Sequence, residues 1–130
     1  MSEAYEFLRK CGTFFLATEE DGQPRVRPFG ALSDFGGKLY IETNNQKKVY
    51  QQLVKNGKVE FCGMHEGKWI RLEGVVKEDT RRKARVAMLE ENPSLKSLAA
   101  PDNGTMTVFY FESGTATVYS FTEEPKVIAL

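Results

Sequence analysis

This sequence has very few of the histidines and cysteines that build zinc sites and histidine-dependent catalytic triads. It contains a single histidine, His65, and only two cysteines, Cys11 and Cys62, which stand far apart in apolar runs. A structural zinc site needs closely spaced cysteine or histidine ligands, and a serine–histidine–aspartate triad needs a histidine with a partner. We therefore expect no metal site and two buried, reduced thiols.

The chain also lacks an excess of charge of either sign and a long apolar run. Its 18 lysines and arginines balance its 18 aspartates and glutamates, whereas general nucleic-acid binders carry a basic excess. No apolar run approaches the roughly 20 residues that span a bilayer. The first residues show neither the basic nor the apolar region of a signal peptide. We therefore expect a cytoplasmic protein that binds neither nucleic acid nor membranes.

What is present is the composition of one globular domain. The 130 residues are 41% hydrophobic and 28% charged, which is ordinary for a chain that folds around one core. We find no internal repeat, linker or low-complexity segment. The sequence predicts a single domain over residues 1–130.

The hydrophobic pattern predicts a mainly β protein with peripheral helices. Apolar residues at helical spacing predict helices over residues 4–11, 45–55 and 80–91, and Pro93 begins another helical turn. Runs of β-branched and aromatic residues between turn signals predict strands over 13–18, 25–35, 38–43, 58–64, 68–79, 105–113 and 115–123. Ser113-Gly114 is taken as the turn between the last two. Because the connections are short, we expect antiparallel strands that close into a small barrel.

Two arginines share one face of the strand predicted over 25–35. Arg25 and Arg27 alternate with Val26 and Pro28, which occupy the other face. Guanidinium groups in this arrangement suit a phosphate group or carbonyl oxygens. The alternative is an edge strand whose charges prevent aggregation. The sequence leaves both interpretations open.

A second polar stretch, Thr43 to Lys48, leads into the second predicted helix. We expect Asn45 to cap this helix and Lys47 and Lys48 to lie in its first turn, where cations oppose the helix dipole. Its apolar stripe is predicted to include Val54, with Gln52 outside the stripe. Backbone N–H groups and lysine charge at a helix start favour a bound phosphate. The alternative is a capped helix with solvated lysines.

The strand predicted over 68–79 carries a tryptophan on its outward face. Ile70 and Leu72 are expected to face the core, which places Trp69 and Arg71 on the opposite side. A large aromatic residue beside an arginine on such a face indicates an interface or the wall of an aromatic ligand's pocket. The alternative is a partly covered Trp69 that Arg71 stacks upon as a cation–π pair.

The order and spacing of these stretches resemble the pyridoxamine 5′-phosphate oxidase-like family of FMN-binding split barrels. The resemblance rests on a G-x-P-x-x-R-P strand, a T-N-x-x-K turn into a helix and a W-[IL]-R-[LI]-x-G strand, and it extends over residues 5–122. More closely, the chain resembles the short bacterial members grouped with nitroimidazole-resistance proteins. The resemblance implies a six-stranded antiparallel split β-barrel with flanking helices, and a homodimer with FMN at the subunit interface.

The resemblance also implies which residues hold the cofactor. The first strand lies along the flavin, the turn holds the FMN phosphate, a helix residue closes the site, and the last strand completes the pocket of the second subunit. In that order, the implied residues are Arg25, Val26, Arg27 and Pro28; Thr43, Asn44, Asn45, Gln46, Lys47 and Lys48; Tyr50 or its neighbour Gln51; and Trp69 and Arg71. No catalytic residue is identified.

The resemblance implies a flavin-dependent oxidoreductase whose substrate the sequence does not name. Two alternatives remain: a flavin-binding carrier or sensor without turnover, and a structural dimer without a cofactor. Pyridoxamine phosphate is not the expected substrate, because the true oxidases bind it through basic and histidine residues near the C-terminus. This sequence has no histidine after His65 and no arginine after Arg85. Some relatives bind a deazaflavin instead of FMN, and others bind haem, which requires an axial ligand.

Overall fold

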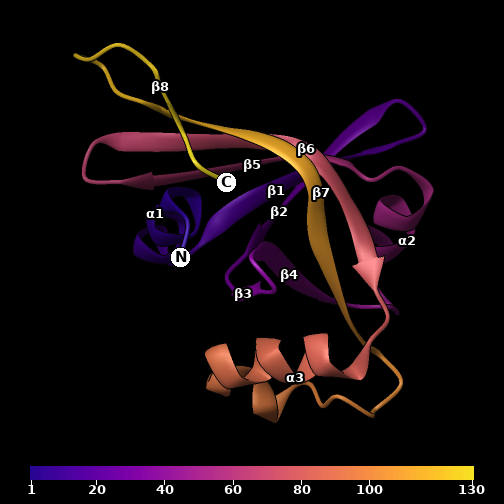
Figure 1. The fold of residues 1–130 in the computed structure, drawn as a ribbon. Helices are drawn as coiled ribbons and strands as arrows, with labels where there is room; N and C mark the ends of the chain where they lie inside the picture. Colours follow the sequence, from indigo (N-terminus) through magenta and orange to yellow (C-terminus); the bar gives the residue numbers. More distant parts are fainter.

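A computed structural model describes residues 1–130 and is organised around one curled antiparallel sheet (Figure 1). The strand order is β2-β1-β5-β6-β7-β4-β3, with β8 paired to β7. The elements are α1 (Glu3–Cys11), β1 (Phe14–Glu20), β2 (Gln23–Phe29), β3 (Leu32–Phe35), β4 (Lys38–Asn44), α2 (Lys48–Lys55), β5 (Lys58–His65), β6 (Lys68–Asp79), α3 (Arg82–Glu91), the 3-10 helix η1 (Pro93–Ser97), β7 (Met106–Tyr119) and β8 (Lys126–Ile128). The predicted fold class, a mainly β antiparallel split barrel with flanking helices, is confirmed, although the sheet has eight strands and not the six that the resemblance implied.

The barrel is open along one line, which we call the seam. β2 and β3 are the two ends of the strand order, yet only Gly30 and Ala31 separate them in the chain. The sheet therefore curls until its two edges approach each other. β2 pairs only with β1, and β3 pairs only with β4. Backbone N–H and C=O groups on the free edges of β2 and β3 therefore have no partner strand along the seam.

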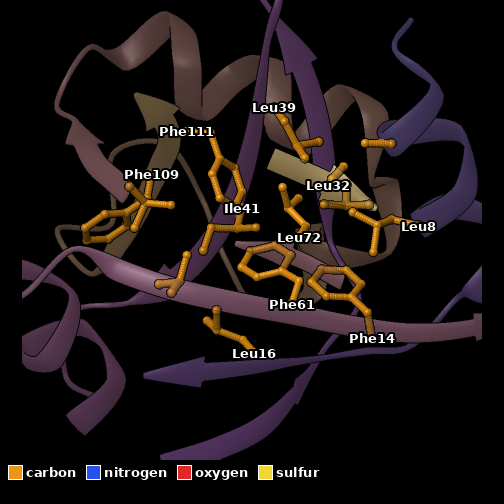
Figure 2. Packing of buried hydrophobic residues seen from close by; sticks show 14 of the residues in the cluster. Leu8, Phe14, Leu16, Leu32, Leu39, Ile41, Phe61, Leu72, Phe109 and Phe111 are labelled. Atoms are coloured by element: carbon orange, nitrogen blue, oxygen red, sulfur yellow. The ribbon is translucent and has the colours of Figure 1, made fainter. Parts of the chain in front are cut away.

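The barrel interior is filled by aromatic and branched side chains from strands on all sides (Figure 2). Phe14 stacks on Phe61 with ring centroids 5.2 Å apart, and Phe61 meets the edge of Phe111 at 5.1 Å. Burial of such rings is the main favourable term in the folding of a chain this small. This core holds the curled sheet rigid around the seam.

Helix α3 covers the outer face of the sheet rather than its interior. Figure 1 shows α3 and the segment after it beneath β4 and β7, while α1 and α2 lie at other sides of the barrel. A second, smaller cluster fixes α3 there through Tyr40, Ala84, Met88, Leu89, Met106 and Val108. β4 is therefore covered on both faces, by the barrel core on one and by α3 on the other. The segment after α3, which includes η1, lies close to the end of β4.

The strands differ from the prediction at three places, one of which is β8, a short strand that was not predicted. The strand expected over 25–35 is broken at Gly30 and Ala31 into β2 and β3, because the chain crosses the seam there. The two strands expected on either side of Ser113-Gly114 are one continuous strand, β7. Gly114 lies opposite Gly74, where an added Cβ would come within 2.2 Å of the Ser113 carbonyl oxygen. These glycines permit a close strand crossing and do not form a turn.

The burial of individual side chains corrects two further predictions, one in strand β5 and one in helix α2. Cys62 is exposed, because Phe61 and Gly63 point to the barrel interior and leave the residue between them outside; Cys11 is half-buried. In α2, Gln52 is buried although it was assigned to the solvent face, and Val54 is 60% exposed although it was assigned to the apolar stripe. A hydrogen-bonded amide thus replaces an apolar contact beneath this short helix.

No helix in the structure is long and apolar enough to cross a membrane. Histidine, cysteine, aspartate and glutamate side chains nowhere gather in a group of three that would hold a metal ion.

Candidate functional site

A cleft of about 390 Å³ opens at the seam of the barrel. Its walls come from the β2–β3 link, the end of β4, the start of α2 and the segment after α3. The lining residues are Pro28, Phe29, Gly30, Ala31, Glu42, Thr43, Lys47, Asn92, Ser94 and Leu95. Clefts of this size with a few polar groups among apolar walls are typical of small-molecule and cofactor sites.

Two stretches that the sequence singled out meet in this cleft. Pro28 belongs to the arginine strand, and Thr43 and Lys47 belong to the polar turn before α2. They are distant in sequence and come together because the curling of the sheet brings the β2 edge to the β4 end. Thr43 is buried, whereas the Lys47 side chain is exposed and makes no ion pair. One cation is therefore free at the mouth of the cleft.

The turn between β4 and α2 is held by its asparagines. The Asn44 side-chain oxygen accepts from the Gln46 N–H at 2.7 Å, and the Asn45 amide donates to the Gly104 carbonyl at 2.9 Å. Asn45 therefore does not cap the helix, contrary to the expectation from the sequence. α2 begins at Lys48, its N-cap residue is Lys47, and no side chain caps its first turn. The positive end of the helix is left open to a ligand.

Arg27 is half-buried, is held by hydrogen bonds within the protein and precedes the lining residue Pro28. Its guanidinium donates to the Leu16 carbonyl at 3.1 Å, to the Thr18 hydroxyl at 2.7 Å and to the Gln52 side-chain oxygen at 2.7 Å. Burial lowers its pKa, although an arginine remains charged. Three of its five N–H donors are thus used to hold β2 against β1 and α2. Arg25 instead pairs with Glu20 at 3.1 Å on the exposed surface.

Glu42 is a charged residue of the cleft that was not predicted from the sequence. It lies between the buried residues Ile41 and Thr43 on β4, and its side chain faces outward toward the segment after α3. Burial raises the pKa of its carboxyl, and the charge of Lys47 offsets only part of that rise. The carboxylate has no hydrogen bond or ion pair in the protein. A charged residue inside an otherwise apolar strand was the available signal.

The wall formed by Asn92, Ser94 and Leu95 was also missed. Pro93 indicated a helical turn, but nothing local shows where such a turn packs. The Asn92 amide donates to the Leu32 carbonyl at 2.7 Å and to the Met88 carbonyl at 2.9 Å, and its oxygen accepts from Arg9 at 2.9 Å. Asn92 is therefore a fixed wall whose hydrogen-bonding groups are already engaged.

Tyr50, Trp69 and Arg71 do not line the cleft of their own chain. Tyr50 packs edge-on against Phe109 and donates its hydroxyl to Glu78 at 2.7 Å. Trp69 stacks on Tyr119 with centroids 5.8 Å apart, on the outer face of the sheet.

The alternative interpretation, in which Arg71 stacks on Trp69, is wrong. The Arg71 guanidinium pairs with Glu60 at 2.7 Å and lies over the Tyr119 ring at 5.7 Å. Arg71 faces a cross-strand neighbour on each side, which draws it away from the tryptophan on its own strand.

The outer face of β2, β1, β5, β6 and β7 carries a row of apolar side chains. The strand register places Pro28 beside Phe15, Phe15 beside Cys62, and Met64 beside Trp69. Phe15 is 49% exposed, Met64 60% and Phe121 86%. Exposed apolar side chains that adjoin one another are typical of protein–protein interfaces. We call this region the outer apolar face.

Comparison with known proteins agrees with this fold. Residues 1–114 match the family described as Pyridoxamine 5'-phosphate oxidase. The structure is similar to a NimC/NimA family protein from Clostridium acetobutylicum, with a TM-score of 0.95 and 48% identity over 98% of this chain and 90% of that chain. No curated protein sequence matches the chain.

Two more distant structures share the fold. General Stress Protein 26 from Bacillus anthracis has a TM-score of 0.69 and 19% identity over 88% of each chain. A pyridoxamine 5'-phosphate oxidase-related, FMN binding protein from Nostoc punctiforme has a TM-score of 0.64 and 14% identity, covering 98% of this chain and 94% of that chain. By its sequence match and its similarity to the Clostridium protein, the chain belongs to the pyridoxamine 5'-phosphate oxidase family.

Proposed function

We propose that this chain binds FMN in the seam cleft and works as a flavin-dependent oxidoreductase. The observation that carries the proposal is the open, uncapped start of α2 with the unpaired Lys47 at the mouth of the cleft. A helix N-terminus with a free cation is suited to a phosphate group. Membership of a family that includes FMN-binding proteins supports the choice of FMN.

The residues present fit each part of the cofactor. Lys47, Lys48 and the turn from Thr43 to Gln46 would hold the phosphate, and β2 from Arg25 to Pro28 would lie along the ring. Phe29 and Leu95 supply apolar walls for an aromatic group. Bound FMN supplies hydride transfer, so the chain itself needs to bind, orient and shield the cofactor. The Arg27 network contributes a fixed positive charge near this wall.

We further propose that the working form is a cytoplasmic homodimer. The outer apolar face would be covered by a second copy, whose Trp69 and Arg71 would complete the flavin pocket. Tyr50 would support the site indirectly, since its hydroxyl is bound to Glu78 and its side chain does not line the cleft. The support is the continuity of the apolar row with Pro28, a residue that both faces the cleft and adjoins Phe15.

The test is FMN binding by the purified protein, measured from the visible spectrum after mixing with FMN and desalting. We expect a retained, perturbed flavin band. Lys47→Gln should weaken FMN binding by about tenfold, because a phosphate loses a charge-assisted contact. Lys58→Gln is the matched control, since Lys58 is an exposed lysine outside the cleft.

The outcomes separate the alternatives. If FMN passes straight through the column, the flavin proposal fails and a deazaflavin becomes the next cofactor to try. If FMN is retained but neither NADH nor NADPH reduces it, the protein is a flavin carrier or sensor. Equal losses of affinity in the two lysine variants would remove Lys47 from the phosphate site.

A further inference from the structure

The carboxylate of Glu42 is the feature of the cleft that the cofactor proposal leaves unexplained. A half-buried ionised group without a partner destabilises the folded state, because burial removes its hydration and no hydrogen bond or ion pair replaces it. The acidic group in register with Glu42 on the same face of the sheet is paired, Asp79 with Arg81. Glu42 alone faces open space, within a cleft that has room for a ligand.

The charges in the cleft are divided between two residues. Among the ten lining residues only Lys47 and Glu42 are charged, and Asn92 has its polar groups engaged by the protein. A cofactor phosphate would take up Lys47. A second ligand in the same cleft then meets the lining groups that the cofactor proposal does not assign, which are the Ala31 methyl group, the Ser94 hydroxyl and one carboxylate, with no free cation from this chain.

We propose that Glu42 determines the substrate class: it accepts a hydrogen bond from a neutral or cationic N–H group of an apolar substrate and excludes anionic substrates. This inference rests on the proposed function, because it assigns Lys47 to the cofactor. An anion in this position would leave two negative charges close together without compensation, whereas an ammonium or amine donor satisfies the carboxylate. Glu42 is a specificity-determining residue in this scheme.

The experiment uses FMN-loaded protein and three probes of similar shape: benzylamine, benzyl alcohol and benzoate at neutral pH. Equilibrium dialysis gives the affinity of each probe without requiring turnover. We expect the wild type to bind benzylamine at least about tenfold more tightly than benzoate, from one charge contact in a partly screened site. Glu42→Gln should bring the two affinities to within about threefold.

Two further variants control the measurement. Glu42→Asp keeps the carboxylate and should keep the order of affinities. Glu112→Gln removes an exposed carboxylate of β7 outside the cleft and should leave the ratio unchanged. Circular dichroism of each variant confirms that it is folded before the probes are compared.

Several results would overturn the inference. These are benzoate binding as tightly as benzylamine, neither probe binding the FMN-loaded wild type, or a ratio that Glu42→Gln leaves unaltered. If Glu42→Gln instead changes the FMN affinity by more than about tenfold while the probe ratio stays, Glu42 serves the cofactor and not the substrate. FMN retention is measured on the same samples, so a failure of the cofactor proposal appears separately as protein without flavin.

Discussion

Two carboxylates occupy matched positions in the sheet and have opposite surroundings. Asp79 of β6 and Glu42 of β4 both pair in register with Val108 of β7, one from each side. Asp79 accepts from the Tyr40 hydroxyl at 2.7 Å and from the Arg81 guanidinium at 2.8 Å, and its side chain is 6% exposed. Glu42 has no such partner and faces the seam cleft.

The difference appears in their ionisation. The Arg81 guanidinium holds the pKa of Asp79 well below its usual range, whereas burial raises the pKa of Glu42. A carboxylate with partners ties β6 to β4 and to the start of α3. A carboxylate without partners carries a cost that a ligand can remove. Matched positions in the sheet thus hold a structural group in one place and a candidate binding group in the other.

The largest effect is expected from Asp79→Asn. The variant removes the charge that Arg81 and Tyr40 bind, and we expect the free energy of unfolding to fall by about 2 kcal/mol. Urea denaturation measures it. Asp102→Asn is the control, because the exposed Arg82–Asp102 pair should contribute nothing measurable. Equal losses in the two variants would contradict a structural role for Asp79.

The same contrast predicts a loss of stability in acid. The pKa of Asp79 is lowered in the folded state from about 3.9 in the unfolded chain, so its contribution is present above about pH 4. It is lost as the pH falls further and the carboxylate is protonated. The stability difference between wild type and Asp79→Asn should therefore shrink below about pH 4. A difference that is constant with pH would show that the charge of Asp79 is not the stabilising feature.

Tyr40→Phe should have a smaller effect, a loss of about 1 kcal/mol for one buried hydrogen bond. Burial, with the bond to Asp79, raises the pKa of Tyr40 to about 12. The unfolded chain ionises near pH 10, so wild-type stability should decrease between about pH 10 and 12 as the folded state resists ionisation. Urea titrations at alkaline pH should show this decrease in the wild type and less of it in Tyr40→Phe.

The smallest effect, and the one of opposite sign, is expected from Glu42→Gln. Removing an unpaired, half-buried charge should stabilise the free protein by about 0.5–1 kcal/mol. The pKa of Glu42 is raised, so its charge costs stability as the pH rises above about 4, and the gain should vanish in more acidic solution. Thermal unfolding of Glu42→Gln measures this gain in stability, with Glu112→Gln as the control variant. A destabilised Glu42→Gln would mean that the carboxylate has a partner in the fold.

Much of the fold could be predicted from local patterns. The Asp21-Gly22 turn and the link around Glu66 and Gly67 are tight hairpins with positive φ angles at both positions, as their sequences indicated. The inward faces of Ile70 and Leu72 follow from alternation. Ser113-Gly114 was wrongly assigned as a turn, because a Ser-Gly dipeptide that forms a turn and one that permits a close strand crossing look the same in sequence.

The candidate site could be predicted only in part. Thr43 and Lys47 were recognised, and the structure brings them to Pro28. Arg27 is held by β1 and also by Gln52, a residue of another element that sequence spacing had assigned to solvent. Glu42 and the wall after α3 were missed, because pairing and covering of β4 depend on packing between distant segments.

The sequence alone determined the family, the alternation of strands and tight turns, and the two polar stretches suited to a phosphate group. Local periodicity and turn chemistry suffice for these, since they depend on neighbours in the chain. The tertiary structure decided where the barrel stays open, which polar groups find partners and which remain free. Those outcomes depend on the curling of the sheet and on the position of α3, which are set by contacts between residues far apart in the sequence.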